Sequence, residues 1–265
     1  MAQCFAMNPA GDVGKVRIPM LEVSDKSWQV RMVTTNKEKS QALSQIFFPK
    51  QPTRDLVPPD PQYPSRVNYS FRPLMVQLRR CVARLRHYKA PGEDGIPNAV
   101  IKELLDLITE YLLEIYRATF TLNTYSNRWR VWDTIMLCKP GKPRYEVPKA
   151  HRPIALMNTL RKLLSALVAE DLTYMCNHYG LLPDHHFSGR PSRCTTDTMH
   201  LLAHRVKAAW HRHNVAAILF LDVEGTFHNA VTARLLYNMC MHQVPEEYVL
   251  FIGHCYESSS RLPNT

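Results

Sequence analysis

The 265-residue chain has no apolar run of about 18 residues, the length that a helix needs to cross a bilayer. Its N-terminus does not combine a cationic start with an apolar stretch, so the sequence predicts no secretory signal. Its seven cysteines are scattered without close spacing, unlike those of a disulfide framework. These absences favour an intracellular protein. Because no dense cluster of Lys and Arg marks a nuclear address, nucleus and cytoplasm both stay open.

Motifs of several enzyme classes are also missing. The sequence contains no glycine-rich phosphate-binding loop, no nucleophile elbow, no carboxylate set typical of an endonuclease and no internal repeat. Histidines and cysteines gather between residues 176 and 204, but only His200 and His204 have the i, i+4 spacing that suits zinc on a helix. We favour a polar helix face beside a nucleic-acid path over a zinc site.

The chain does have an excess of positive charge. Its Lys and Arg residues number 33 against 23 Asp and Glu, which gives a net charge of +10 and a pI near 9.3. This excess favours a polyanionic partner, either nucleic acid or an anionic membrane surface, although a basic protein can also bind neither. The hydrophobic content of 45% predicts a folded globular protein.

Residues 1–64 are predicted to form an irregular region that ends in a proline-rich connector. Weak strands are expected around Trp28–Val33, and Asn36 is expected to cap a helix that ends at Phe48. The stretch Pro49–Pro64 is expected to be extended, because proline lacks the N–H donor that helices and sheets need.

Residues 65–265 mix helical and strand-like patterns, which predicts an α+β fold. Apolar residues at helical spacing predict helices over residues 74–85, 101–115, 159–179, 195–209, 230–241 and 245–256, and short strands are expected at 133–138 and 152–156. In the helix from Thr195, the residues expected to face inward are Met199, Leu202, Val206 and Ala209. The apolar run Val215–Val223 is expected to be a strand buried on both faces.

Asp222 lies at the end of that apolar run. A carboxylate at the end of a buried strand is costly unless it faces a cleft or binds a cation. Aspartate oxygens suit Mg²⁺, which usually takes one or two protein carboxylates together with substrate phosphates. Taken alone, however, such an aspartate is more often a helix cap or a hydrogen-bonded loop acid.

Five segments, taken together, are more specific than this aspartate. They are Lys89-Ala-Pro-Gly-Glu-Asp-Gly-Ile-Pro97, Lys139-Pro-Gly-Lys142, Arg152-Pro-Ile154, Phe187-Ser-Gly-Arg-Pro-Ser-Arg193 and Leu221-Asp-Val-Glu-Gly-Thr-Phe227. In order and spacing they resemble the reverse transcriptases of non-LTR retrotransposons, and the resemblance covers residues 65–257. It implies the right-hand fold of polymerases, with the fingers and an incomplete palm in residues 65–265 and no thumb.

The resemblance also implies roles for individual residues. Asp222 matches the first metal-binding aspartate of the palm, which would hold Mg²⁺, and Val223 matches the position whose backbone carbonyl helps to hold the metal. Phe227 matches the aromatic gate that excludes a ribose 2′-OH. These assignments predict an RNA-directed DNA polymerase ancestry.

Basic residues of the other segments are expected to contact nucleotides. Lys139 and Arg152 match fingers residues that contact the triphosphate of the incoming dNTP, and their alternative is to be exposed loop charges. Arg190 lies in the segment that lines the path of the RNA template and DNA primer. Trp129, Trp132 and Trp210 could stack on bases, although core packing is the commoner role of tryptophan.

The chain also departs from the family pattern. His186 stands where Gln is usual, Ser188 where Gly is usual, and His228 where Pro or Asp is common. No Asp-Asp pair of the family's Tyr/Phe-x-Asp-Asp hairpin occurs, so we expect a truncated, inactive polymerase that does not polymerise alone. The strand at Val215–Val223 would lose its partner and expose an edge that associates with another chain. The alternatives are a non-catalytic nucleic-acid-binding remnant and a structural partner.

Overall fold

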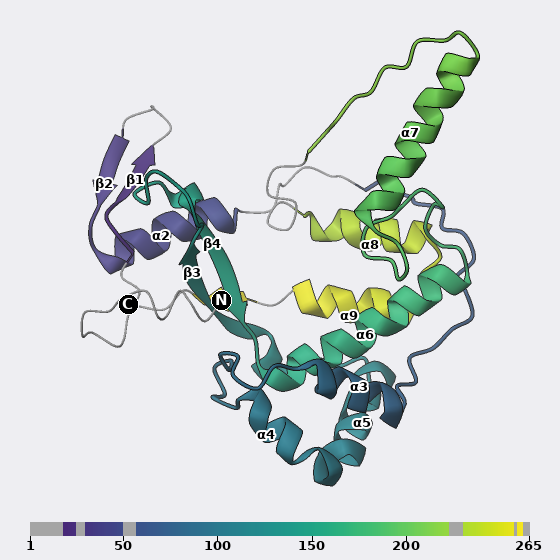
Figure 1. Ribbon diagram of the computed structural model, residues 1–265. Helices are drawn as coiled ribbons and strands as arrows, with labels where there is room; N and C mark the ends of the chain where they lie inside the picture. Colours follow the sequence, from purple (N-terminus) through teal and green to yellow (C-terminus); the bar gives the residue numbers. More distant parts are fainter. Residues whose placement is uncertain (1–17, 25–29, 50–56, 223–229, 257–258, 262–265) are drawn as a thin grey trace. The chain divides into compact units, whose positions relative to one another are not determined.

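The computed structural model of the protein describes residues 18–24, 30–49, 57–222, 230–256 and 259–261 (Figure 1). The chain divides into two compact units. Unit 1 comprises residues 1–49, 134–154 and 262–265, and unit 2 comprises residues 50–133 and 155–261. Helices and short strands are mixed along the chain, which confirms the predicted α+β class. The polymerase right-hand fold and the boundary at residues 64/65 stay predictions.

Unit 1 packs a helix on a small antiparallel sheet. Strand β1 (Leu21–Ser24) pairs with β2 (Val30–Val33) so that Leu21 lies opposite Val33, and both of these side chains are buried. Helix α2 (Asn36–Phe47) covers them with Leu43. The strand expected around residues 28–33 is therefore confirmed from Val30, while residues 25–29 lie outside the described residues.

The N-terminus of α2 corrects one sequence prediction. Thr35 caps the helix, because its side chain accepts a hydrogen bond from the N–H of Glu38 while the Glu38 carboxylate accepts one from the N–H of Thr35. Asn36, the predicted cap, is the first helical residue. Threonine followed three residues later by glutamate is the sequence pattern of a capping box, and it begins one residue before the predicted cap.

A second sheet runs through the middle of the chain. Strand β3 (Val131–Cys138) pairs with β4 (His151–Leu156), which confirms the two strands expected there. In unit 1, Met136 of β3 joins the core formed by β1 and α2. In unit 2, the first three residues of β3 pair in parallel with β5 (Ser259–Arg261), a strand that the sequence patterns did not predict.

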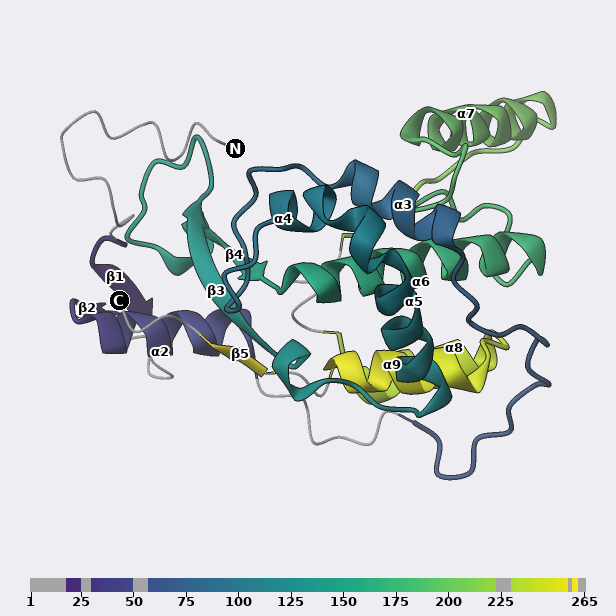
Figure 2. The ribbon, with the colours of Figure 1, turned by 90° about the horizontal axis from the view of Figure 1, so that it is seen from below.

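Unit 2 is built around four helices that enclose its main core (Figure 2). They are α3 (Met75–Arg84), α5 (Leu105–Thr121), α6 (Thr159–His178) and α9 (Glu246–Tyr256). The most deeply buried side chains of this core are Leu78, Tyr116, Leu163, Leu164, Met175 and Tyr248. Their spacing along each helix is the pattern from which the helices were predicted.

One predicted helix is broken in two. Residues 101–115 were expected to be continuous, but Leu104 separates α4 (Asn98–Glu103) from α5. Leu104 has φ −93° and ψ 4°, values outside the regular helix. Apolar spacing alone does not reveal such a break, because it is nearly continuous across Leu104.

A polar cluster lies inside unit 2. Asp171 of α6 is 6% exposed and accepts hydrogen bonds from the hydroxyl groups of Tyr69, at 2.5 Å, and Tyr248. These bonds join the segment before α3, helix α6 and helix α9. Burial, together with the Asp171 carboxylate, raises the pKa values of both tyrosines, so they stay protonated hydrogen-bond donors.

Helix α7 (Thr195–His211) differs from its prediction. None of its residues is buried, and Met199, one of the residues expected to face inward, is 64% exposed. In Figure 1 the helix projects from the other helices of unit 2. Helix α8 (Thr232–Met241) instead packs against α9. The amphipathic pattern of α7 predicted the helix correctly, but its apolar face does not pack into a described core.

The expectation of a buried strand at Val215–Val223 is wrong for its described residues. Residues 215–222 have no regular secondary structure, and Val215, Leu219 and Phe220 are 95%, 80% and 80% exposed. A strand buried on both faces needs neighbouring strands and covering layers, and the described residues form neither around this run. Apolar composition reports a preference for burial but does not supply the partners.

Within the described residues, no helix combines the length and apolar character needed to cross a membrane.

Candidate nucleic-acid interface

The β3–β4 hairpin in unit 1 positions two of the predicted nucleotide-contacting residues. Lys139 directly follows β3, and its backbone N–H donates to the carbonyl of Ala150, 2.8 Å away, next to the start of β4. The Lys139 ammonium donates to the carbonyl of Lys149 at 2.6 Å. Arg152, the second residue of β4, has an exposed side chain. The hairpin therefore holds Lys139, just after β3, beside the start of the strand that carries Arg152.

The turn of this hairpin is fixed to the rest of unit 1. Gly141 has a φ of +75°, a conformation that favours glycine, and it allows the chain to turn just after Lys139. Arg144 pairs with Glu22 of β1 and lies 3.6 Å from the Glu146 carboxylate. The carbonyl of Glu146 in turn accepts from the N–H of Glu22 at 2.8 Å. These contacts tie the basic turn to the small sheet.

His151 directly precedes Arg152 in the sequence. It is buried, with 1% of its surface exposed. Its ring packs edge-on against Tyr145, with 6.3 Å between ring centroids. Burial lowers the pKa of His151, and the Lys139 ammonium lowers it further, so the ring is neutral at neutral pH. A neutral ring adds no positive charge to the hairpin and serves there as packing.

A second predicted segment, the loop of residues 89–97, is anchored on the start of α6 in unit 2. Thr159 donates from its hydroxyl group to the carbonyl of Ile96 at 2.9 Å, and the Lys162 ammonium donates to the carbonyl of Ala90 at 3.3 Å. Gly92 approaches Asn158 so closely that no side chain fits between them. The loop is therefore held by residues of α6 that the sequence reading did not single out.

The third segment, Phe187–Arg193, ends the loop of residues 180–193, which is held by its own arginines. Arg190 donates from Nε to Oδ1 of Asn177 at 2.9 Å and from a terminal nitrogen to the carbonyl of Pro183 at 3.1 Å. The guanidinium of Arg193 lies 5.3 Å from the centre of the Phe187 ring. Arg190 thus fixes the loop to α6, and it is partly exposed.

The predicted metal residues are described only in part. Asp222 is exposed, and Val223 and Phe227 lie outside the described residues. Among the described side chains there is no group of three His, Cys, Asp or Glu residues that could hold a metal ion. The described residues therefore do not amount to a magnesium site.

The predicted residues fall into separate groups. Lys139 and Arg152 both belong to the hairpin of unit 1, whereas Arg190 and Asp222 belong to unit 2. Of the three tryptophans considered for base stacking, Trp129 is 8% exposed and Trp132 lies under the guanidinium of Arg161, 4.7 Å from its ring centre. Only Trp210 is largely exposed, at 64%.

Tyr88 is an exposed aromatic residue that the sequence analysis did not single out. Tyr88 is 99% exposed between Arg86 and Lys89, just before the anchored loop. The carbonyl of Arg86 accepts from the side chain of Asn98 at 2.8 Å, so the backbone beside Tyr88 is fixed. An exposed ring flanked by cations suits stacking on a nucleic-acid base. The basic residues around it were the only available sequence signal.

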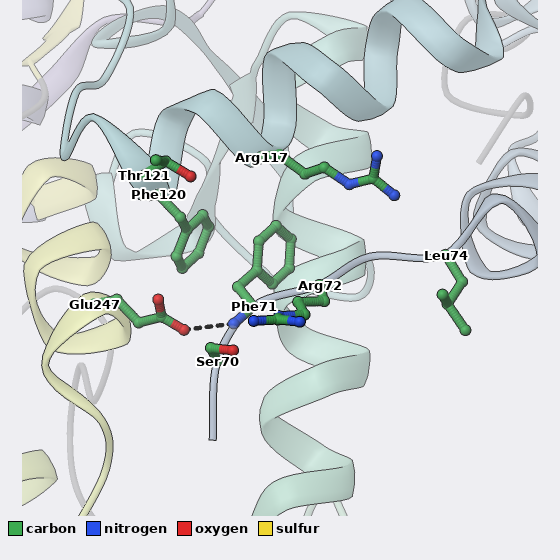
Figure 3. A pocket seen from close by; sticks show the side chains of 8 residues that line it. All are labelled: Ser70, Phe71, Arg72, Leu74, Arg117, Phe120, Thr121 and Glu247. Carbon is green, nitrogen blue, oxygen red and sulfur yellow. Dashed lines mark hydrogen bonds between the residues drawn. The ribbon is translucent and has the colours of Figure 1, made fainter. Parts of the chain in front are cut away.

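Unit 2 also contains a shallow hollow of about 490 Å³ between α5 and α9 (Figure 3). Phe71 and Phe120 stack at 4.0 Å between ring centroids, and Glu247 accepts a hydrogen bond from the backbone N–H of Phe71. Burial raises the pKa of Glu247. The Glu247 carboxylate is hydrogen-bonded to the backbone, and none of the predicted residues lines the hollow. We therefore assign the hollow a structural role.

Comparison with known proteins gives three informative relatives, although no family model matches the chain. The chain is 30% identical over 165 residues to a probable RNA-directed DNA polymerase from transposon BS of Drosophila melanogaster. These 165 residues are 62% of this chain and 18% of that protein. It is 29% identical over 151 residues to a probable RNA-directed DNA polymerase from transposon X-element of the same species. The aligned residues are 57% of this chain and 16% of that relative.

The third relative is the RNA-directed DNA polymerase from mobile element jockey of Drosophila melanogaster. The identity is 25% over 174 residues, which are 66% of this chain and 19% of the relative. The chain thus spans less than a fifth of the length of each of these curated relatives.

Proposed function

We propose that this chain is a reverse-transcriptase segment whose β3–β4 hairpin binds the triphosphate of a dNTP. The basis is the confirmed relationship of the chain to the RNA-directed DNA polymerases of non-LTR retrotransposons. The observation that carries the proposal is the backbone hydrogen bond from the N–H of Lys139 to the carbonyl of Ala150. Ala150 lies two residues before Arg152 in the sequence. Two cations on one hairpin can neutralise a polyphosphate, and arginine can contact it with two hydrogen bonds. Phosphoryl transfer depends on this kind of positioning and charge neutralisation.

The nucleic-acid partner in this proposal is an RNA template paired with a DNA primer. The supporting features are the anchored loop of residues 89–97 with exposed Tyr88 beside it, Arg190 in its fixed loop, and the net charge of +10. We further propose that the polymerase-related part begins at residue 65 and that the protein acts inside the cell, in the nucleus or cytoplasm.

The proposed chemistry of the chain by itself is limited. Asp222 and Val223 would contribute to Mg²⁺ binding and Phe227 to ribose exclusion, as the family resemblance implies. The 265 residues contain no Asp-Asp pair, and two-metal catalysis needs several carboxylates around the cations. We therefore propose that the 265-residue polypeptide binds nucleotide and nucleic acid without extending a primer.

A second candidate function is docking onto another chain through residues 215–221. The specific observation is that Val215, Leu219 and Leu221 are exposed by 95%, 80% and 83% in one short segment. An apolar run without strand neighbours can pair with a strand of another polypeptide. This candidate requires no nucleotide.

The hairpin is tested with a fluorescent dNTP and the purified chain. Lys139→Ala/Arg152→Ala is expected to weaken triphosphate binding at least about tenfold, since charge-assisted phosphate contacts are lost. Arg31→Ala/Lys37→Ala is the matched control, because it removes the same charge from exposed residues of unit 1 outside the hairpin. Equal affinity of the hairpin variant and the control would refute the role of the hairpin.

Two further assays test the nucleic acid and the chemistry. Binding to an RNA–DNA primer–template is expected to weaken steeply as salt rises, because cations on the protein displace counterions from phosphates. Primer extension with Mg²⁺ and dNTPs is expected to give no product. Extension that disappears in Asp222→Ala would overturn the proposed lack of activity, and salt-independent binding would favour docking over nucleic-acid binding.

A further inference from the structure

Helix α5 has two apolar faces, and only one of them is buried. The inner face packs Leu112, Leu113 and Tyr116 into the core of unit 2. The second face carries Leu107, Tyr111 and Ile115, which are 73%, 73% and 48% exposed. Their i, i+4, i+8 spacing places them in one row along the helix. Leu122, 69% exposed, directly follows the helix two turns after Ile115.

One border of this outer row is acidic. Residues 103–116 contain four acids, Glu103, Asp106, Glu110 and Glu114, and no Lys or Arg, in a chain whose net charge is +10. All four are exposed. Within α5, the i, i+4, i+8 spacing of Asp106, Glu110 and Glu114 places them along the same side of the apolar row, whereas Glu103 belongs to α4, before the break at Leu104. Asp106 forms an ion pair with Arg79 at 2.6 Å, and Glu114 forms one with Arg117 at 2.7 Å.

This combination restricts what can cover the face. A nucleic acid would bring its phosphates against the acidic border, so the face is unsuited to the proposed substrate. A second α5 packed antiparallel would oppose like charges when the two apolar rows met, and one packed parallel would leave both acidic borders without a basic partner. The remaining occupant is a helix with an apolar row and basic flanks, because such a helix satisfies both features at once.

The chain itself contains a helix of this kind. Helix α7 buries none of its residues and exposes Met199 and Trp210, each by 64%. Met199, Val206 and Trp210 fall on one helical face at positions i, i+7 and i+11. Arg205 and Lys207 are exposed on the same helix, whose single acidic residue is Asp197.

We propose that α7 of one copy of this protein docks on the outer face of α5 of a second copy, with apolar rows in contact and the basic flanks of α7 beside the acidic border of α5. The two surfaces differ, so each copy offers both halves of the contact. Such head-to-tail association forms rings or open assemblies instead of stopping at a closed symmetric dimer. The inference does not depend on nucleotide binding.

A charge-swap experiment tests the pairing. Glu110→Lys/Glu114→Lys makes the border of α5 basic, and Arg205→Glu/Lys207→Glu makes α7 acidic. In sedimentation velocity, the wild-type chain is expected to self-associate, and each variant alone is expected to do so about tenfold more weakly because like charges meet. An equimolar mixture of the two variants is expected to associate again, since each then offers the charge that the other lacks.

Control variants separate this contact from other surfaces. Asp60→Lys/Asp184→Lys makes the same charge change at exposed acids away from α5 and is expected to leave association unchanged. Leu107→Ser/Tyr111→Ser is expected to abolish association, whereas Leu219→Ser/Phe220→Ser is expected to preserve it. A monomeric wild type, failure of the mixture to associate, or loss in only the last variant would overturn the proposal. Circular dichroism checks that every variant folds, and unchanged dNTP binding by the α5 variants keeps this test separate from the proposed function.

Discussion

A Cβ atom placed on Gly92 would stand 2.4 Å from Oδ1 of Asn158 and 2.5 Å from its backbone nitrogen. The loop that carries the first of the five family segments therefore touches the start of α6 through bare backbone. Thr159 and Lys162, on the first turns of α6, complete the contact with hydrogen bonds to loop carbonyls. Glycine is needed at this position for space, since a backbone neighbour cannot move aside as a flexible side chain can.

Gly92→Ala is expected to lower the free energy of unfolding by about 2 kcal/mol, the usual scale for forcing atoms into a packed site. Urea denaturation measures the change. Gly253→Ala is the matched control, because the nearest atom to its new Cβ would be a leucine methyl at the ordinary distance of 3.6 Å. The control lies in α9, where alanine is expected to stabilise by about 0.5–1 kcal/mol. Equal destabilisation by both changes would contradict the close contact.

The buried carboxylate of Asp171 is expected to depend on both of its tyrosine donors. Tyr248→Phe removes one hydroxyl group and leaves Asp171 with less compensation, so it is expected to cost about 1–3 kcal/mol of unfolding free energy. Tyr174→Phe, at a tyrosine that is 55% exposed, is expected to change stability little. Thermal and urea unfolding report both values, and a neutral Tyr248→Phe would show that the cluster contributes nothing to stability.

His151 is expected to make the stability of unit 1 depend on pH. Its pKa in the folded protein is lowered from the ordinary value of 6.5, mainly by burial. The unfolded chain then binds more protons than the folded one between these two pKa values, so stability falls as the pH drops below about 6.5. His151→Gln is expected to flatten this dependence, whereas His200→Gln, at an exposed histidine of α7, is expected to preserve it. The test is to measure unfolding midpoints of each variant across acidic pH. If the midpoint of His151→Gln changes with pH as steeply as that of the wild type, His151 is not the source of the pH dependence.

Arg190 is expected to have a local structural effect as well as any effect on nucleic acid. Arg190→Ala removes the bonds to Asn177 and Pro183, so the loop of residues 180–193 is expected to be cleaved faster by a protease. Arg212→Ala removes the same charge from an exposed residue after α7 and serves as the control. Mass spectrometry of the fragments locates the cleavage. The same cleavage rate in both variants would leave Arg190 without a role in holding the loop.

The amino-acid sequence determined the family relationship and the positions of several helices. Spacing of apolar residues placed α3 and α6 to within a residue or two, because a helix that packs on a core repeats its apolar side chains regardless of what it packs against. The five segments were sufficient to predict the relationship to retrotransposon polymerases that the comparisons then confirmed. Neither conclusion required knowledge of distant contacts.

Tertiary structure alone decided which apolar faces are covered. The sequence pattern predicted that the apolar run from Val215 and Met199 of α7 are buried, yet both are exposed. Burial depends on partners that lie far away in sequence or outside the chain. The same reason explains the anchoring of the loop at Gly92 and the pairing of Asp171 with two tyrosines. Local sequence sets the period of an element, whereas long-range packing sets its neighbours.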